Sequence, residues 1–131
     1  MALEHSREER TARLFTEELR LFDLAETMQG LRGEPEYAAN GRNGTTLVKD
    51  AELRVVLQVL REGAEMAEHH APGPITVQVL DGEIQFSVGE VVHTLRPGGL
   101  LVLPTRRPHA VKAARDSAFL LTIAPLARPE A

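Results

Sequence analysis

The sequence contains no cysteine and no tryptophan, and it has only four phenylalanines and one tyrosine. Without cysteine the chain forms no disulfide and no thiolate metal site, so any metal would be bound by nitrogen and oxygen atoms. Stacking aromatics are scarce, no basic run is present and the net charge is −4. Nucleic-acid-binding surfaces are usually basic and often aromatic, so we expect no nucleic-acid partner.

Long apolar runs are also missing from the sequence. No stretch approaches the roughly 18 uninterrupted apolar residues of a membrane-spanning helix, so we expect no membrane partner. The first residues, "MALEHSREERTARLF", alternate acids and bases and lack the apolar centre of a signal peptide. These features predict a cytoplasmic protein.

What is present suits one folded domain. The chain has 131 residues, of which 43% are hydrophobic and 26% are charged. A chain of this length and composition can bury a core of its own. We predict an N-terminal helical arm and loop over residues 1–44, followed by a single β-barrel domain over residues 45–131.

The N-terminal part has helical periodicity. Apolar residues recur at helical spacing over residues 6–29 without proline or glycine. Asp23 is placed to cap a second, shorter helix. We expect Gly30 and Gly33 to end that helix, and Pro35 to begin a loop through the two Asn-Gly turn signals of "NGRNG".

The pattern changes from Thr45 onward. Short β-rich segments alternate with turn residues, a rhythm typical of an antiparallel sandwich or barrel. The segments are "TTLVK", "ELRVVLQVL", "ITVQVL", "EIQFSV", "VVHTL", "LLVLP", "HAVKAA" and "SAFLLTIA". Between the third and fourth, Asp81-Gly82 predicts a tight type I′ turn, which needs positive φ at both residues.

Two groups of residues in this region have a recognisable spacing. The first group is Gly63, His69 six positions later, and Gly82. The second group is Gly98, Pro104 six positions later, and His109. With these residues the block from Leu53 to Ala124 resembles the cupin superfamily. The resemblance implies a mainly β fold, a cupin-type jelly-roll β-barrel with an N-terminal helical segment.

The resemblance also implies a ligand set. In cupins that bind metal, three histidines and one carboxylate converge inside the barrel and hold iron, manganese, nickel, copper or zinc. Here only His69 and His109 carry over. The position of the second histidine is occupied by Ala71, and that of the carboxylate by Ile75.

Two local substitutes could complete the set. The amide oxygen of Gln78 could be a neutral ligand, but it faces inward only if a bulge separates it from Ile75, because alternate residues of a strand share a face. In a shifted register His70 replaces Ala71 and Glu68 replaces His69, with His69 pointing outward. We therefore take His69, His109, Gln78 and His70 as the candidate metal ligands.

Other polar residues are weaker candidates. Glu83 is a further carboxylate that a metal could recruit. Arg106 and Arg107 would attract an anionic molecule if they lie at the barrel mouth, although a solvated turn is the preferred interpretation. His93 reads as a sheet residue, and His5 as a solvated one.

Three functions fit this pattern. The first is a barrel that binds a small molecule, with or without a divalent transition metal, without catalysing a reaction. The second is a metal-dependent oxygenase or isomerase acting on a small acid or carbonyl compound, and the third is a structural dimer module. The resemblance implies a homodimer, because cupin barrels often pair through edge strands, and an unpaired "ELRVVLQVL" edge would otherwise invite aggregation.

Overall fold

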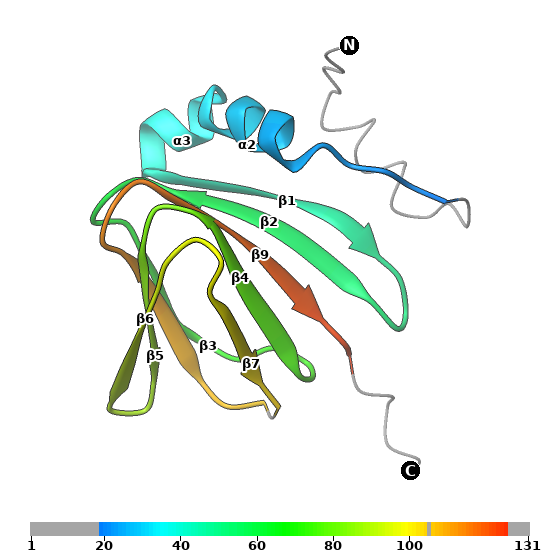
Figure 1. The fold of residues 1–131 in the computed structure, drawn as a ribbon, viewed down its shortest axis with the longest axis vertical. Helices are drawn as coiled ribbons and strands as arrows, with labels where there is room; N and C mark the ends of the chain where they lie inside the picture. Colours follow the sequence, from blue (N-terminus) through cyan, green and yellow to red (C-terminus); the bar gives the residue numbers. More distant parts are fainter. Residues whose placement is uncertain (1–18, 105, 126–131) are drawn as a thin grey trace.

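Two antiparallel sheets lie face to face in a computed structural model, which describes residues 19–104 and 106–125 (Figure 1). One sheet has the strand order β1-β2-β9-β4-β7 and the other β3-β8-β5-β6. The strands are β1 (Arg42–Lys49), β2 (Arg54–Leu60), β3 (Glu65–His69), β4 (Ile75–Asp81), β5 (Ile84–Val88), β6 (Val91–Leu95), β7 (Leu100–Leu103), β8 (His109–Ala113) and β9 (Ser117–Ile123). The architecture confirms the predicted mainly β, jelly-roll fold.

The main core lies between the two sheets. On β4, Ile75, Val77 and Val79 are at most 1% exposed. They face Ile84 and Phe86 of the other sheet, which are equally buried. Because the side chains of a strand alternate between its two faces, a one-residue slip of β4 would move all three into solvent. The apolar alternation therefore sets the register of the barrel.

A short helix, α2 (Leu24–Arg32), precedes the sheets. The side chain of Asp23 accepts a hydrogen bond from the backbone N–H of Glu26 at 3.0 Å, which confirms the predicted cap. Gly30 lies inside the helix and does not end it; Gly33 is the C-cap. The rest of the predicted helix over residues 6–29 lies largely outside the described residues, as does His5.

The helix covers the outer face of the five-stranded sheet near β1 and β2 (Figure 1). Leu31 and Met28 of α2 belong to a second apolar cluster with Leu57 and Val59 of β2. The helix thus packs on the sheet of its own chain. No helix within residues 19–104 and 106–125 is long and apolar enough to cross a membrane.

The predicted loop after Pro35 is wrong. Pro35–Asn40 forms helix α3, with proline in the first turn, where its missing N–H is tolerated. Gly41 ends this helix with a φ of 73°. Asn43 then lies buried in β1, and its side-chain amide donates to the carbonyl of Leu31 at 3.0 Å and to Glu34 Oε1 at 2.8 Å. One Asn-Gly pair is therefore a helix end and the other belongs to a strand.

The predicted type I′ turn at Asp81-Gly82 is also wrong. Among the described residues only glycines have positive φ, so Asp81 does not meet the requirement, whereas Gly82 has a φ of 79°. The reason is topological, because β4 and β5 belong to different sheets and form no hairpin. A Cβ on Gly82 would collide with Asp116 and Ser117.

The edges of the sheets differ from expectation. The segment "ELRVVLQVL" contains β2, which pairs with β1 on one side and with β9 on the other. It is therefore not an edge strand, and β1, β7, β3 and β6 occupy the edges. One boundary also shifts, because β1 begins at Arg42, before Thr45, and one further strand, β3, was not among the expected segments.

Candidate functional site

The site begins with an irregularity between β3 and β8. Met66 pairs with Val111, and the next pair along the two strands is His69 with His109. Three steps along β3 therefore match two along β8, which is a β-bulge with one extra residue. In a regular strand Glu68 would share the face of Met66. The bulge instead places His69 opposite His109.

The two histidines contact each other in unlike surroundings. Their ring centroids are 4.4 Å apart and the rings are inclined at 66°. His109 is only 3% exposed, and it stacks on Phe86 with a centroid distance of 5.1 Å. His69 is exposed at the end of its strand. One histidine is thus held by the core, and the other lies where solvent can reach it.

Hydrogen bonds orient both rings in the same manner. Nδ1 of His69 lies 2.8 Å from the carbonyl oxygen of Ala67, and Nδ1 of His109 lies 3.0 Å from that of Arg107. A carbonyl oxygen only accepts, so Nδ1 carries the proton in each ring. The neutral imidazole then has its lone pair on Nε2. Metal-binding histidines usually have this arrangement, with one nitrogen donating to a backbone carbonyl and the other free to bind.

The protonation of His109 favours the same role. Burial lowers the pKa of His109, because the charged ring loses hydration. The hydrogen bond to the carbonyl of Arg107 raises this pKa in part, and the neighbouring His69 and His70 lower it further. His109 is therefore neutral at neutral pH, which is the state that binds metals or accepts hydrogen bonds.

The remaining two family positions carry no donor atoms. Ala71 is 9% exposed and Ile75 is 1% exposed, and both belong to the apolar core. No group of three or more histidine, cysteine, aspartate or glutamate side chains in the described part of the chain is arranged to hold a metal. The residues present thus fit a metal with two protein nitrogens, and not the full four-ligand set.

The structure does not bring Gln78 to the histidine pair. Its side chain is exposed on the outer face of β4, while Val77 and Val79 on either side point into the core. The irregularity of β4 falls after Val79, so no bulge reverses the side of Gln78. Gln78 therefore lies on the outer face of β4, and apolar side chains occupy the inner face where an amide ligand was considered.

The other candidates also have definite places. His70 is exposed just after β3 and lies near enough to His109 to influence its pKa. Glu68 is exposed within the bulged part of β3. Glu83 forms an ion pair with Arg96 at 2.9 Å. Only His70 among these three lies beside the histidine pair as a further nitrogen donor.

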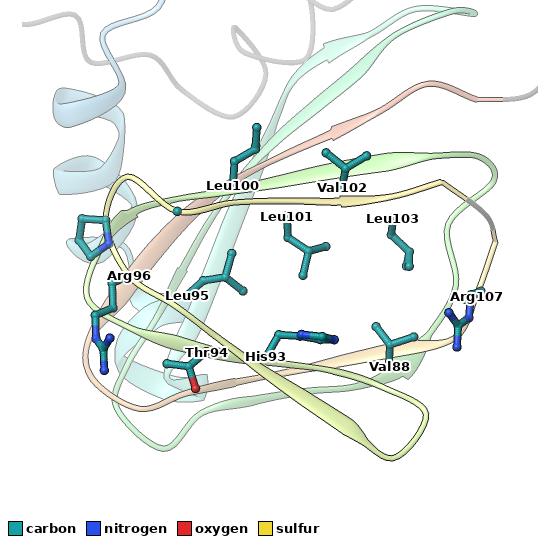
Figure 2. A pocket seen from close by; sticks show the side chains of 12 residues that line it. Val88, His93, Thr94, Leu95, Arg96, Leu100, Leu101, Val102, Leu103 and Arg107 are labelled. Carbon is teal, nitrogen blue, oxygen red and sulfur yellow. The ribbon is translucent and has the colours of Figure 1, made fainter.

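A groove of about 560 Å³ runs between the edge strands β6 and β7 (Figure 2). Its lining residues are Val88, His93, Thr94, Leu95, Arg96, Pro97, Gly99, Leu100, Leu101, Val102, Leu103 and Arg107. His93 faces the groove from β6, where its position is opposite the inward-facing Phe86. The sequence places His93 on one face with Val91 and Leu95, but it contains no sign that this face borders an opening.

The groove and the histidine pair are neighbours on one sheet surface. Across the inner face of the four-stranded sheet, His69 contacts His109, His109 stacks on Phe86, and Phe86 pairs with His93. These four rings lie on β3, β8, β5 and β6, which are adjacent in that order. Phe86 thus separates the histidine pair from the groove by the width of one strand.

The sequence matches the family model described as the cupin domain over residues 56–124. The chain belongs to the cupin family. A conserved protein of unknown function from Streptococcus pyogenes is 26% identical with a TM-score of 0.67, and the match covers 88% of this chain and 93% of that one. An RmlC-like cupin from Desulfovibrio desulfuricans is also 26% identical, with a TM-score of 0.62 and coverage of 72% and 92%.

One further solved structure combines higher identity with lower coverage of its own length. A Cupin 2 conserved barrel domain protein from Leptotrichia buccalis is 30% identical with a TM-score of 0.65, covering 79% of this chain and 47% of that one. No curated protein matches the sequence. Cupin domains commonly bind transition metals and small molecules.

Proposed function

We propose that this cupin binds a small organic molecule in its barrel, together with a divalent transition metal held by His69 and His109. One observation carries the proposal. Both rings donate Nδ1–H to a backbone carbonyl two residues earlier, so both leave the lone pair of Nε2 available. The shared orientation of the two contacting rings supports a common role for them.

The ligand set suggests which metals fit. Imidazole nitrogens suit iron, nickel, copper and zinc, and manganese is held where oxygen donors join them. His70 is the third nitrogen that we assign to the metal, because it follows His69 directly and lies near His109. Water or oxygen atoms of the organic ligand would supply the other donors. A metal at this place would act as a Lewis acid on a bound oxygen atom.

An enzyme is the alternative function. A metal-dependent oxygenase or isomerase acting on a small acid or carbonyl compound needs open coordination positions on its metal. Ala71 and Ile75 stand where the family has ligands, so a metal here would keep those coordination positions open. The non-catalytic binder is preferred because no carboxylate other than the exposed Glu68 lies on the strand of His69 near the pair. Activity assays on metal-loaded protein would separate the two functions.

The test is metal binding by untagged protein. After treatment with a chelator, the protein would be titrated with iron(II), manganese, nickel, copper and zinc, and the bound metal measured by elemental analysis. We expect about one ion per chain for at least one metal. His69→Ala and His109→Ala would abolish binding, and His70→Ala would weaken it at least about tenfold, because one of the assigned nitrogen ligands is lost.

His93→Ala is the matched control, because His93 lies on the same inner face beyond Phe86 and is not assigned to the metal. It should bind metal like the unmodified protein. Circular dichroism would show that each variant is folded. Equal loss in His93→Ala, or no binding of any of the five metals, would refute the metal assignment.

Two further features belong to the proposal. We expect a homodimer, whose contact would use one of the edge strands β1, β3, β6 or β7 and not β2. We also expect the protein to be cytoplasmic. Size-exclusion chromatography with light scattering gives the mass in solution, and a mass of one chain at every concentration would contradict the dimer.

A further inference from the structure

The groove between β6 and β7 concentrates positive charge in an acidic protein. The whole chain has a net charge of −4. The residues that line the groove nevertheless include Arg96 and Arg107, and no aspartate or glutamate. A concave surface of one sign attracts small molecules of the opposite sign. The charge of the groove therefore points to an anionic ligand.

The two arginines lie at opposite ends of the groove and differ in their partners (Figure 2). Arg96 Nε is paired with Glu83 Oε1 at 2.9 Å, so its charge is largely balanced. No ion pair of Arg107 is found within the described ranges, 19–104 and 106–125. Arg107 also lies next to the histidine pair, because its carbonyl accepts the hydrogen bond of His109 Nδ1. The uncompensated charge is thus at the Arg107 end of the groove, opposite the Arg96–Glu83 ion pair.

The walls between the two arginines are apolar. Leu101 and Leu103 point from β7 toward His93 and Val88 of the other sheet (Figure 2). Leu103 and Val88 are buried and belong to the core between the sheets. Sites for small molecules are typically apolar with a few polar anchors. A ligand for this groove needs an apolar body as well as a charge.

We propose that the organic ligand of this cupin is a small monocarboxylic acid with an aliphatic or aromatic body. Its carboxylate pairs with the guanidinium of Arg107, and its body lies between Leu101, Leu103 and Val88. The fork of N–H donors in arginine matches the two oxygens of a carboxylate. This inference rests on the proposed function for the existence of an organic ligand, but it does not depend on the metal.

The test uses the full chain after chelator treatment and three probes. 4-Phenylbutyrate has both charge and body, 4-phenylbutanamide has the body alone, and acetate has the charge alone. Isothermal titration calorimetry should detect 4-phenylbutyrate, with both other probes at least about fivefold weaker, because each lacks one of the two contacts. Equal binding of the acid and the amide would overturn the assignment to Arg107.

Two arginine variants localise the site. Arg107→Gln should weaken 4-phenylbutyrate at least about fivefold, and Arg107→Lys should restore part of the loss, because lysine keeps the charge without the fork. Arg96→Gln is the matched control from the other end of the groove, with a change of less than about twofold. Equal effects of Arg96→Gln and Arg107→Gln would refute the proposed orientation.

The outcomes separate the two proposals. Acid binding that depends on Arg107 in a protein that takes up no metal would retain the groove site and remove the histidine metal site. Metal uptake that depends on His69 and His109, with no binding of 4-phenylbutyrate, would do the reverse. Binding of the acid that Arg107→Gln leaves unchanged would also overturn the inference.

Discussion

The outer face of the five-stranded sheet has two halves that carry similar apolar residues and differ in their exposure to solvent. In one half, Leu57 and Val59 of β2 are 0% exposed beneath α2. At the far edge of the same face, Leu100 and Val102 of β7 are 61% and 59% exposed. The covered half can stabilise the fold, which leaves the β7 edge free to form one wall of a groove. Coverage by the helix, and not hydrophobicity, distinguishes the two halves.

The largest expected effect tests this difference directly. Leu57→Ala should lower the free energy of unfolding by about 2–5 kcal/mol, because a buried leucine leaves a cavity. Leu100→Ala should change it by no more than about 0.5 kcal/mol, since its side chain is already in solvent. Urea denaturation of both variants gives the comparison. Similar losses would mean that something covers the β7 edge in solution.

A second pair of variants examines the link between the two sheets. Gly82→Ala and Gly89→Ala both place a side chain at positive φ, which costs about 1–2 kcal/mol. Only at Gly82 does the new Cβ also meet Asp116 and Ser117, whereas nothing lies within 4 Å of that position at Gly89. Gly82→Ala should therefore lose about 1–3 kcal/mol more, as for overpacking. Equal midpoints in urea would show that the crossing between the sheets yields easily.

The smallest effect concerns the helix that covers β2. Asp23→Ala removes the hydrogen bond to the backbone N–H of Glu26 and should cost about 1 kcal/mol. Asp23→Asn keeps a capping oxygen and should be close to neutral. Hydrogen exchange of the α2 amides would register the change. Unchanged exchange in Asp23→Ala would show that packing alone holds the helix.

Local patterns in the sequence predicted the parts of the fold that depend on near neighbours. The alternation of strand residues predicted that Gln78 faces away from the side of Ile75 unless a bulge intervenes, because a strand residue can point to only two faces. The resemblance to the cupin superfamily, which rests on residues such as Gly63, His69 and His109, implied that the two histidines come together, and their rings are in contact. Asp23 was recognised as a helix cap because capping involves residues three positions apart.

Features that depend on distant partners could not be predicted in this way. "NGRNG" reads as two turns, yet Asn43 is drawn into β1 by hydrogen bonds to Leu31 and Glu34. The groove exists because β6 and β7 are edge strands of facing sheets. No local pattern states which strands lie at the edges. Arg107 was therefore recognised as a charge without a definite place.

The bulge in β3 has a consequence for changes in chain length. Three steps on β3 now match two on β8, so removal of Ala67 or Glu68 would yield a regular pairing in which Met66 still faces Val111 and His69 still faces His109. A deletion at this point would therefore shorten the strand without separating the histidines. An insertion would put the alternation of faces out of step. The strand thus tolerates loss of a residue better than gain.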